Sequence, residues 1–164
     1  MISPVEISQK ILEQIQNIEE KILSAFSGVG MWAIELFEDE NGKILVNEIA
    51  PRAHNSGHQS IEGNVISQFA QYMRICLGYP AGSPESLGTA ITYNLLGSGE
   101  SSGESCYTGI SKIMSIPNVY PHLYGKKTTK PHRKMGHITV TGKTSQECWE
   151  KIETVKKTVF VTGK

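Results

Sequence analysis

The stretch that decides the fold is residues 31–58, MWAIELFEDENGKILVNEIAPRAHNSGH. Two alternating, β-rich runs flank the pair Asn41-Gly42, and Asn-Gly between such runs is a strong signal for a two-residue hairpin turn. In such a hairpin, directly opposed residues have numbers that add up to the same total as the turn pair. Glu35 and Glu48 satisfy this condition, so the sequence predicts that they face each other across the hairpin.

The predicted carboxylate pair has apolar neighbours on its strands, because strand side chains alternate with period two. Like charges opposed across two strands are destabilising, and two close carboxylates resist double ionisation unless a proton or cation neutralises them. Two carboxylates without sulfur favour a hard ion such as Mg²⁺, which also takes ligands from water and phosphate. The alternative is a longer turn through Asp39 and Lys43, which would shift the register and leave both glutamates in solvent.

The residues after the second strand form a polar loop suited to anions. Pro51 cannot continue a central strand, so the chain leaves the sheet there. Arg52 can contact a phosphate or a carboxylate with both arms of its guanidinium, and the alternative for Arg52 is a structural salt bridge to one of the glutamates. His54 and His58 have a spacing that could hold a metal on a helix, but Pro51 and Gly57 argue against a helix here.

Two further stretches carry composition signals. Residues 97–109, GSGESSGESCYTG, are rich in Gly and Ser and lack the spacing and the Lys-Ser/Thr pair of a Walker loop. They predict a flexible connection rather than a phosphate-binding loop. Residues 125–134 hold five of the sixteen basic residues, and a solvated hairpin loop is the simplest interpretation of that run.

Five strings of this sequence resemble one family, the 5-(carboxyamino)imidazole ribonucleotide synthases, the ATPase part of phosphoribosylaminoimidazole carboxylase within the ATP-grasp superfamily. The strings are VNEIAPR from Val46, HNSGH from His54, NLLG from Asn94, YGK from Tyr124 and RKMGH from Arg133. Position 50 is Ala, where the wider superfamily usually has a metal-binding Asn, which leaves two carboxylates as the expected ligands. The chain departs from the family at Ala53, where Pro is usual, and at Gln59-Ser60, where a Tyr-Thr-type pair is usual.

The resemblance implies ATP-dependent carboxylation of the amine of aminoimidazole ribonucleotide by bicarbonate, through carboxyphosphate, in de novo purine biosynthesis. ATP and Mg²⁺ are the implied cofactors. The implied site residues are Glu35 and Glu48 for the metal, Asn47 and Glu48 for the nucleotide, Arg52 and His54 for catalysis, and Asn55, Ser56, Lys126, Arg133 and Lys134 for the substrate and its phosphate.

The predicted fold class is α+β, with the C-terminal part of an ATP-grasp domain followed by a small β-rich module. We assign residues 1–97 to the ATP-grasp part, 98–109 to a flexible Gly/Ser linker and 110–164 to the substrate-phosphate module with its terminal helix. The hairpin and a strand at 90–96 are expected to share one antiparallel sheet covered by two long helices. Capping patterns predict helices that begin at Ser3-Pro4 and at Thr144, and a third helix is predicted over 60–77. Further predicted elements are a short helix at 109–115 and strands at 119–124, 137–141 and 159–161.

The overall composition excludes several classes of protein. The chain has 164 residues, with 16 basic and 16 acidic side chains, which gives no case for a nucleic acid or an anionic membrane as partner. It has no apolar run of membrane-spanning length. Three cysteines without a Cys-x-x-Cys pair argue against a disulfide framework or a zinc site and fit the reducing cytoplasm.

The resemblance covers roughly residues 28 to 142 and only the C-terminal part of the family's enzyme. We expect the N-terminal nucleotide-fold domain and the lid, with the lysines that hold ATP, to lie outside this chain, and the chain alone to be inactive. The alternative is a non-catalytic remnant that binds a phosphorylated ligand or a partner chain. A homodimer is a further candidate assembly.

Overall fold

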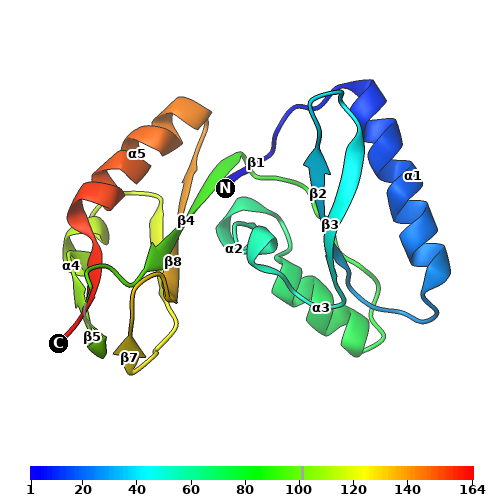
Figure 1. The fold of residues 1–164 in the computed structure, drawn as a ribbon. Coiled ribbons are helices and arrows are strands. Elements are labelled where there is room, and N and C mark those ends of the chain that lie inside the picture. The colour runs from blue at the N-terminus through cyan, green and yellow to red at the C-terminus, as the bar shows by residue number, and fades with distance from the viewer. Residues whose placement is uncertain (101) are drawn as a thin grey trace.

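The computed structural model describes residues 1–100 and 102–164, which form two lobes that meet near the centre of the molecule (Figure 1). The hairpin lobe contains α1 (Gln9–Ala25), β2 (Ala33–Glu38), β3 (Ile44–Ala50) and α3 (Gln68–Cys76). The C-terminal lobe contains β4 (Thr89–Leu96), β8 (Lys134–Gly142) and α5 (Ser145–Thr158). The short helix α2 (Ser60–Gly63) lies between them.

The largest sheet belongs to the C-terminal lobe and has the strand order β1-β4-β8-β6, with every pair antiparallel. Its outer strands are β1 (Ile2–Ser3) and β6 (Val119–Leu123). One face is apolar and packs on α5. The core of the lobe forms there, between Ile91, Ile138 and Val140 of the sheet and Ile152 and Val155 of the helix. The other face carries the buried polar side chains of Thr92, Thr139 and His137. The buried His137 of this polar face belongs to the histidine stack described below.

The hairpin forms a separate two-stranded sheet of β2 and β3. The prediction that it shares a sheet with the strand at 90–96 is therefore wrong, because β4 pairs with β1 and β8 instead. Strand β4 lies in the C-terminal lobe, where its residues Ile91 and Leu95 belong to the core beside α5. The α+β class, with antiparallel strands and helices, is confirmed, but the predicted boundary at residue 97 does not follow the sheets.

A third sheet has the order β7-β5-β9, with β7 (Thr128–Thr129), β5 (Gly103–Thr108) and β9 (Phe160–Gly163). Strand β5 occupies half of the predicted linker 98–109, so that part of the linker prediction is wrong, while Ser101 of the linker lies outside the described residues. Within this Gly/Ser-rich stretch, residues 103–108 pair on both sides, with β7 and with β9. The Tyr107 hydroxyl also donates a hydrogen bond to the carbonyl of Met135 (3.0 Å).

Two helix predictions need correction. The capping pattern at Ser3-Pro4 does not start a helix, because Ile2 and Ser3 pair with β4, and α1 begins at Gln9 with Ser8 as its N-cap. The predicted helix 60–77 is split into α2 and α3, and the Ser67 hydroxyl caps α3 by accepting from the Ala70 N–H (3.2 Å). A polar side chain that can cap a new helix thus interrupts an apolar pattern that looks continuous.

The elements predicted after residue 108 are confirmed. Helix α4 spans Ile110–Ile113, and the remaining predicted strands correspond to β6, β8 and β9. The Thr144 hydroxyl caps α5 by accepting from the Glu147 N–H (3.2 Å), as the capping pattern predicts. In residues 1–100 and 102–164, no helix is long and apolar enough to cross a lipid bilayer. Cys76, Cys106 and Cys148 are free thiols.

Candidate functional site

The hairpin turn differs from the two-residue turn that the sequence predicts. The Asp39 N–H donates to the Lys43 carbonyl (3.0 Å), and the Asp39 carboxylate accepts from the backbone N–H groups of Asn41 and Lys43 (2.9 Å each). Among the turn residues 39–43, only Gly42 has a positive φ, of 74°. The aspartate side chain therefore stabilises a longer turn, which by itself would shift the strand register.

A β-bulge compensates for the longer turn. Leu36 pairs with Val46, but Glu35 pairs with Glu48, so Asn47 is the extra residue on the second strand. An extra residue on one strand shifts the register by one. Glu35 and Glu48 are consequently opposed, as predicted, although the predicted turn geometry was wrong.

His54 lies beside the carboxylate pair. Its Nε2 is 3.7 Å from Glu35 Oε1 and 3.9 Å from Glu48 Oε1. The Asn47 amide donates to Glu35 Oε2 (3.0 Å). The two glutamate side chains are 41% and 53% exposed, respectively, so the pair is open to solvent on one side despite its apolar strand neighbours.

The donor set of this pair suits a hard divalent ion. In the described part of the chain, no group of three or more His, Cys, Asp or Glu residues could hold a metal ion by itself. Mg²⁺ commonly takes one or two carboxylates and completes its octahedron with water and substrate phosphates. Two opposed, half-exposed carboxylates leave room for such additional ligands.

The loop that carries His54 fixes the orientation of its ring. His54 is the N-cap of a single 3₁₀ turn, Asn55–Gly57, and its Nδ1 accepts from the Ser56 N–H (3.3 Å). The Ser56 hydroxyl is 2.8 Å from the same nitrogen. Because Nδ1 is an acceptor, the proton of the neutral ring is on Nε2, the nitrogen that faces the two carboxylates.

Arg52 is exposed, and its Nη1 donates to the carbonyl of Ala53 (2.9 Å). Among the ion pairs of residues 1–100 and 102–164, none joins Arg52 to Glu35 or Glu48. The alternative of a structural salt bridge is therefore not observed. The guanidinium is available to an anion that approaches the loop.

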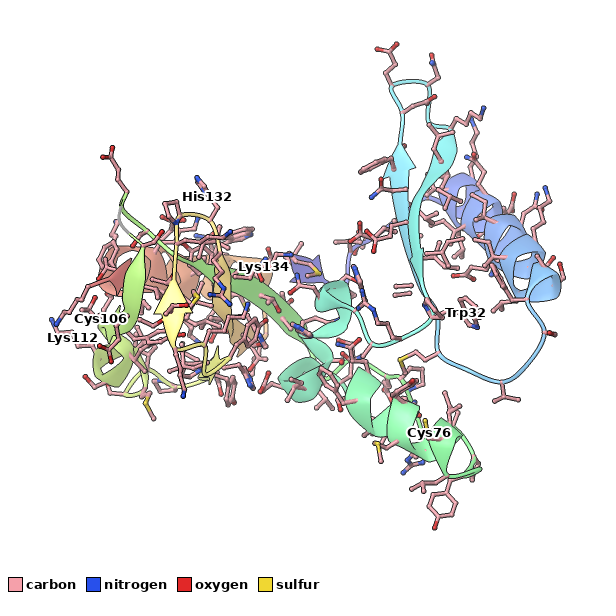
Figure 2. The ribbon with its side chains drawn as sticks, turned by 60° about the horizontal axis from the view of Figure 1, so that its bottom comes forward. Trp32, Cys76, Cys106, Lys112, His132 and Lys134 are labelled. Atoms are coloured by element: carbon pink, nitrogen blue, oxygen red, sulfur yellow. The ribbon has the colours of Figure 1, made fainter. Side chains whose placement is uncertain are left out.

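The predicted cationic loop lies in the other lobe, between β6 and β8. Lys126 donates to the carbonyl of Lys134 and lies 5.6 Å from the centre of the Tyr124 ring. Arg133 Nη1 donates to the carbonyl (2.8 Å) and to the hydroxyl (3.2 Å) of Thr128. These contacts tie the side chains of Lys126 and Arg133 to the backbone of their own segment. In Figure 2, Lys134 lies on the side of its lobe that faces the hairpin lobe.

Gly97, the last residue of the NLLG string, anchors this loop. Its N–H donates to the Arg133 carbonyl (2.8 Å), and its carbonyl accepts from the His132 N–H (3.0 Å). A Cβ at this position would collide with the Lys130 carbonyl. Only glycine therefore fits between β4 and the cationic loop.

Three stacked imidazoles connect the two clusters, and the sequence did not reveal them. The rings of His122 and His137 have centroids 4.4 Å apart, and those of His58 and His137 are 4.7 Å apart. The Tyr124 hydroxyl is hydrogen-bonded to His137 Nδ1 (3.0 Å), and the Glu62 carboxylate accepts from His122 Nε2 (2.8 Å). His137 is 3% exposed, and burial, followed by the nearby His122 and His58, lowers its pKa to about 4.

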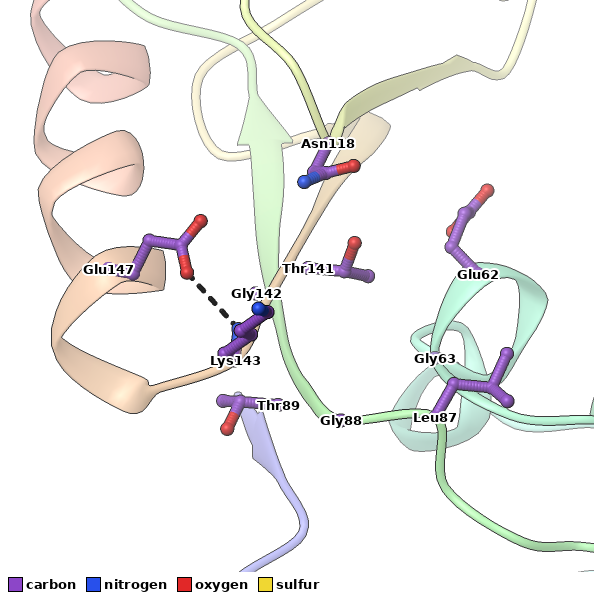
Figure 3. A pocket seen from close by; sticks show the side chains of 10 residues that line it. All are labelled: Glu62, Gly63, Leu87, Gly88, Thr89, Asn118, Thr141, Gly142, Lys143 and Glu147. Atoms are coloured by element: carbon purple, nitrogen blue, oxygen red, sulfur yellow. Dashed lines mark hydrogen bonds between the residues drawn. The ribbon is translucent and has the colours of Figure 1, made fainter.

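A hollow of about 290 Å³ opens between α2 and the ends of β4 and β8 (Figure 3). It is lined by Glu62, Gly63, Leu87, Gly88, Thr89, Asn118, Thr141, Gly142, Lys143 and Glu147. Within the described residues, no predicted site residue lines it. The hydrogen bond from the Lys143 N–H to Glu147 (3.1 Å), dashed in Figure 3, closes one wall.

Comparison with known proteins gives two family matches. Residues 1–69 match the ATP-grasp domain, and residues 90–151 match the phosphoribosylaminoimidazole carboxylase C-terminal domain. The chain is 33% identical to phosphoribosylaminoimidazole carboxylase of Ogataea methanolica over 165 aligned positions, which cover 96% of this chain and 30% of the relative. It is 33% identical to N5-carboxyaminoimidazole ribonucleotide synthase of Aquifex aeolicus, covering 88% of this chain and 38% of that one.

Solved structures agree with these matches. The N5-carboxyaminoimidazole ribonucleotide synthetase of Thermotoga maritima superposes with a TM-score of 0.88 at 41% identity, over 99% of this chain and 45% of that one. The enzyme of Aspergillus clavatus in complex with ADP and 5-aminoimidazole ribonucleotide gives a TM-score of 0.80 at 35% identity, over 95% and 42% of the two chains. This chain thus spans less than half the length of each of these four relatives.

Proposed function

Because the chain belongs to the ATP-grasp family over residues 1–69 and to the phosphoribosylaminoimidazole carboxylase C-terminal domain family over 90–151, we propose that it forms part of a carbon–nitrogen ligase. The reaction is the ATP-dependent carboxylation of aminoimidazole ribonucleotide by bicarbonate, through carboxyphosphate, in purine biosynthesis. We assign it to the cytoplasm.

The observation that carries the proposal is the opposition of Glu35 and Glu48 next to His54. A β-bulge maintains this opposition in spite of a long turn. The pair fits Mg²⁺, which would neutralise the phosphate oxygens of ATP at this position. Asn47, whose amide contacts Glu35, is the neighbouring polar contact that we assign to the nucleotide.

The loop after β3 supplies groups that can stabilise a reacting oxyanion. His54 directs its Nε2 proton toward the carboxylate pair, and Arg52 adds a permanent positive charge from an exposed position. Preorganised donors of this kind stabilise developing negative charge without reorganisation. We assign Asn55 and Ser56, in the same 3₁₀ turn, to contacts with the substrate.

The cationic loop binds the phosphate of the ribonucleotide in this proposal. Lys126, Arg133 and Lys134 come from one segment, and Gly97 fixes its backbone. Several cations presented together suit a phosphate dianion, since arginine can bind two of its oxygens and lysine adds a point charge. The substrate would then span from this loop to His54, with its amine at the hairpin lobe.

Titration of the chain with aminoimidazole ribonucleotide, followed by NMR, tests the phosphate clamp. We expect shifts at Lys126, Arg133 and Lys134, and a loss of affinity of about 10-fold or more in Lys126→Ala, because a hydrogen bond to a charged group contributes about 1.5–3 kcal/mol. Lys112→Ala removes the same charge from an exposed position of α4, on the far side of the lobe (Figure 2), and is the control. An equal loss in both variants would reduce the clamp to nonspecific attraction.

A second experiment tests the metal site. Mn²⁺ can replace Mg²⁺ at oxygen sites and broadens nearby NMR signals, so we expect broadening centred on Glu35 and Glu48 that an excess of Mg²⁺ reverses. Glu48→Gln should abolish it, whereas Glu38→Gln should not, because Glu38 pairs with Ile44. Broadening that persists in Glu48→Gln would remove this residue from the metal site.

A further inference from the structure

The amide of Gln68 makes three hydrogen bonds that bind two histidines of the loop. Gln68 Oε1 accepts from the His54 N–H (2.9 Å), which fixes this atom as the oxygen. Gln68 Nε2 then donates to the His54 carbonyl (2.9 Å) and contacts His58 Nδ1 (3.0 Å). The amide therefore spans from the backbone of one histidine to the ring of the other.

The contact with Gln68 decides which nitrogen of His58 carries the proton. An amide NH₂ can only donate, so His58 Nδ1 must accept and the proton of the ring must be on Nε2. Gly57 lies against the clamp, since a Cβ there would come within 2.5 Å of Gln68 Oε1. Addition of a proton to His58 Nδ1 would set two donors against each other and break the clamp.

The ring of His58 connects the Gln68 clamp to the C-terminal lobe by stacking on His137. It stacks between Phe69 of α3 (centroids 5.7 Å apart) and His137 of β8 (4.7 Å). His137 is joined to Tyr124 (3.0 Å), whose ring lies under the Nζ of Lys126 (5.6 Å). A continuous series of contacts thus runs from His54 to the cationic loop.

We propose that Gln68 is a positioning residue that holds His54 and His58 in one amide clamp and, through the stacked rings of His58 and His137, sets the place of the cationic loop relative to the carboxylate pair. The proposal rests on the proposed function, because the two parts whose relative position it concerns, the carboxylate pair and the cationic loop, are the two parts of that site. The arrangement requires both stacked rings to be neutral.

The surroundings of the stack favour the neutral rings. Burial, followed by the charges of His122, His54 and Lys134, lowers the pKa of His58. His137 faces His58, His122 and Tyr124. Among the described residues, Glu62 is the carboxylate that contacts these rings. It is hydrogen-bonded to the outermost ring, His122. Protonation of His58 is thus opposed by its neighbours and by Gln68.

The chain offers a matched pair of substitutions. Gln68→Glu keeps the size and the acceptor for the His54 N–H, but it replaces the donor that faces both the His54 carbonyl and His58 by a carboxylate oxygen. Gln71, on the same helix, makes a similar clamp on Gly82, with its Oε1 accepting from the Gly82 N–H (2.9 Å) and its Nε2 donating to the Gly82 carbonyl (2.6 Å). Gln71→Glu therefore makes the same chemical change in the same type of clamp without an imidazole.

Two-bond ¹H–¹⁵N correlation across the imidazoles, recorded from pH 8 to pH 4, tests the proposal on this chain without ligand. In the unmodified chain we expect His58 to be the Nε2–H tautomer, and the amide signals of Tyr124 and Lys126 to change together with the titration of His58. In Gln68→Glu, His58 should become protonated at Nδ1 and its pKa should rise, and the loop signals should follow to higher pH. Gln71→Glu should leave all of these unchanged.

The proposal is overturned if His58 is the Nδ1–H tautomer in the unmodified chain, if both variants shift its titration equally, or if the loop signals do not follow it. Should Gln68→Glu fail to fold, His58→Phe decides, because it keeps a ring in the stack but has no proton to gain. The step in the Lys126 signal at the midpoint of the His58 titration should then vanish, and its persistence at that pH would overturn the coupling. Failure of aminoimidazole ribonucleotide to bind would instead count against the proposed function and leave these measurements as they are.

Discussion

The two lobes bury their residues very differently. The main hydrophobic core lies entirely between Ile91 and Val161, in the C-terminal lobe. In the described structure α1 has no buried residue, and β3 buries only Ile44 and Ala50 at its ends. The comparison teaches that the C-terminal lobe carries the packing energy, whereas the hairpin lobe holds its carboxylates by hydrogen bonds and register on an open surface.

The sharpest way to break this comparison is to truncate a large apolar side chain in each lobe. Ile152 is 1% exposed and Phe37 is 58% exposed. Ile152→Ala should lower the free energy of unfolding by about 2–5 kcal/mol, since it removes buried methyl groups and leaves a cavity. Phe37→Ala should change it by about 0.5 kcal/mol or less. Urea denaturation measures both, and a larger effect for Phe37 would reverse the assignment of the core.

Acid should destabilise the C-terminal lobe through His137. The pKa of His137 is lowered to about 4, first by burial and then by His122 and His58. Above the unfolded value of about 6.5 the ring is neutral in both states and contributes nothing. As the pH falls from there to about 4, His137 becomes protonated in the unfolded chain but stays neutral in the folded one. The free energy of unfolding therefore falls by up to about 3 kcal/mol.

Urea denaturation at several pH values between 7 and 4 checks this slope. His137→Phe should remove most of the contribution of this ring, because phenylalanine fills similar space and cannot be protonated. The control is His132→Asn, which removes an exposed imidazole at a φ of 62° that asparagine tolerates. Equal slopes in the unmodified chain and in His137→Phe would contradict the prediction.

The carboxylate pair shows what could be predicted from the sequence. Strand alternation and the Asn-Gly signal correctly indicated that Glu35 opposes Glu48, but two errors cancelled. The turn is longer because the side chain of Asp39 accepts two backbone hydrogen bonds, and the bulge at Asn47 restores the register. Neither feature has a signal in the hydrophobic pattern, because both depend on side-chain and backbone hydrogen bonds that form only in the folded hairpin.

The stacked histidines show what could not be predicted. His122 and His137 are directly opposed on β6 and β8, but the pairing of two strands separated by a long loop cannot be read from period alone. His58 joins them only because Gln68 and the short helices orient its loop. The strand predicted at 90–96 was assigned to the wrong sheet for a related reason, since alternation identifies the buried face of a strand but not its neighbours.

A smaller effect is expected where α1 supports the hairpin. Gln14 Nε2 donates to the Gly42 carbonyl (2.9 Å), and Gln14 Oε1 accepts from the Ile44 N–H (3.2 Å). Gln14→Ala should cost about 1 kcal/mol, the scale of an ordinary hydrogen bond, and should speed hydrogen exchange at Ile44. Gln16→Ala, at an exposed position of the same helix, should do neither. Unchanged exchange at Ile44 in Gln14→Ala would show that the hairpin does not depend on α1.

The smallest expected effect is also the one that best separates a metal-binding pair from a structural one. At pH 8, without divalent ions, Glu48→Gln removes a like-charge contact with Glu35, and such cross-strand pairs contribute about 0.2–1 kcal/mol. The free energy of unfolding should therefore be unchanged or slightly higher, and the difference should shrink at 1 M salt, where the Debye length is about 3 Å. Glu38→Gln is the control, because Glu38 pairs with Ile44 and not with a carboxylate.

A group that supports the fold moves stability in the opposite direction when it is neutralised. A loss of more than about 1 kcal/mol in Glu48→Gln, the scale of a lost hydrogen bond, with Mn²⁺ broadening retained, would identify Glu48 as a structural residue of the hairpin.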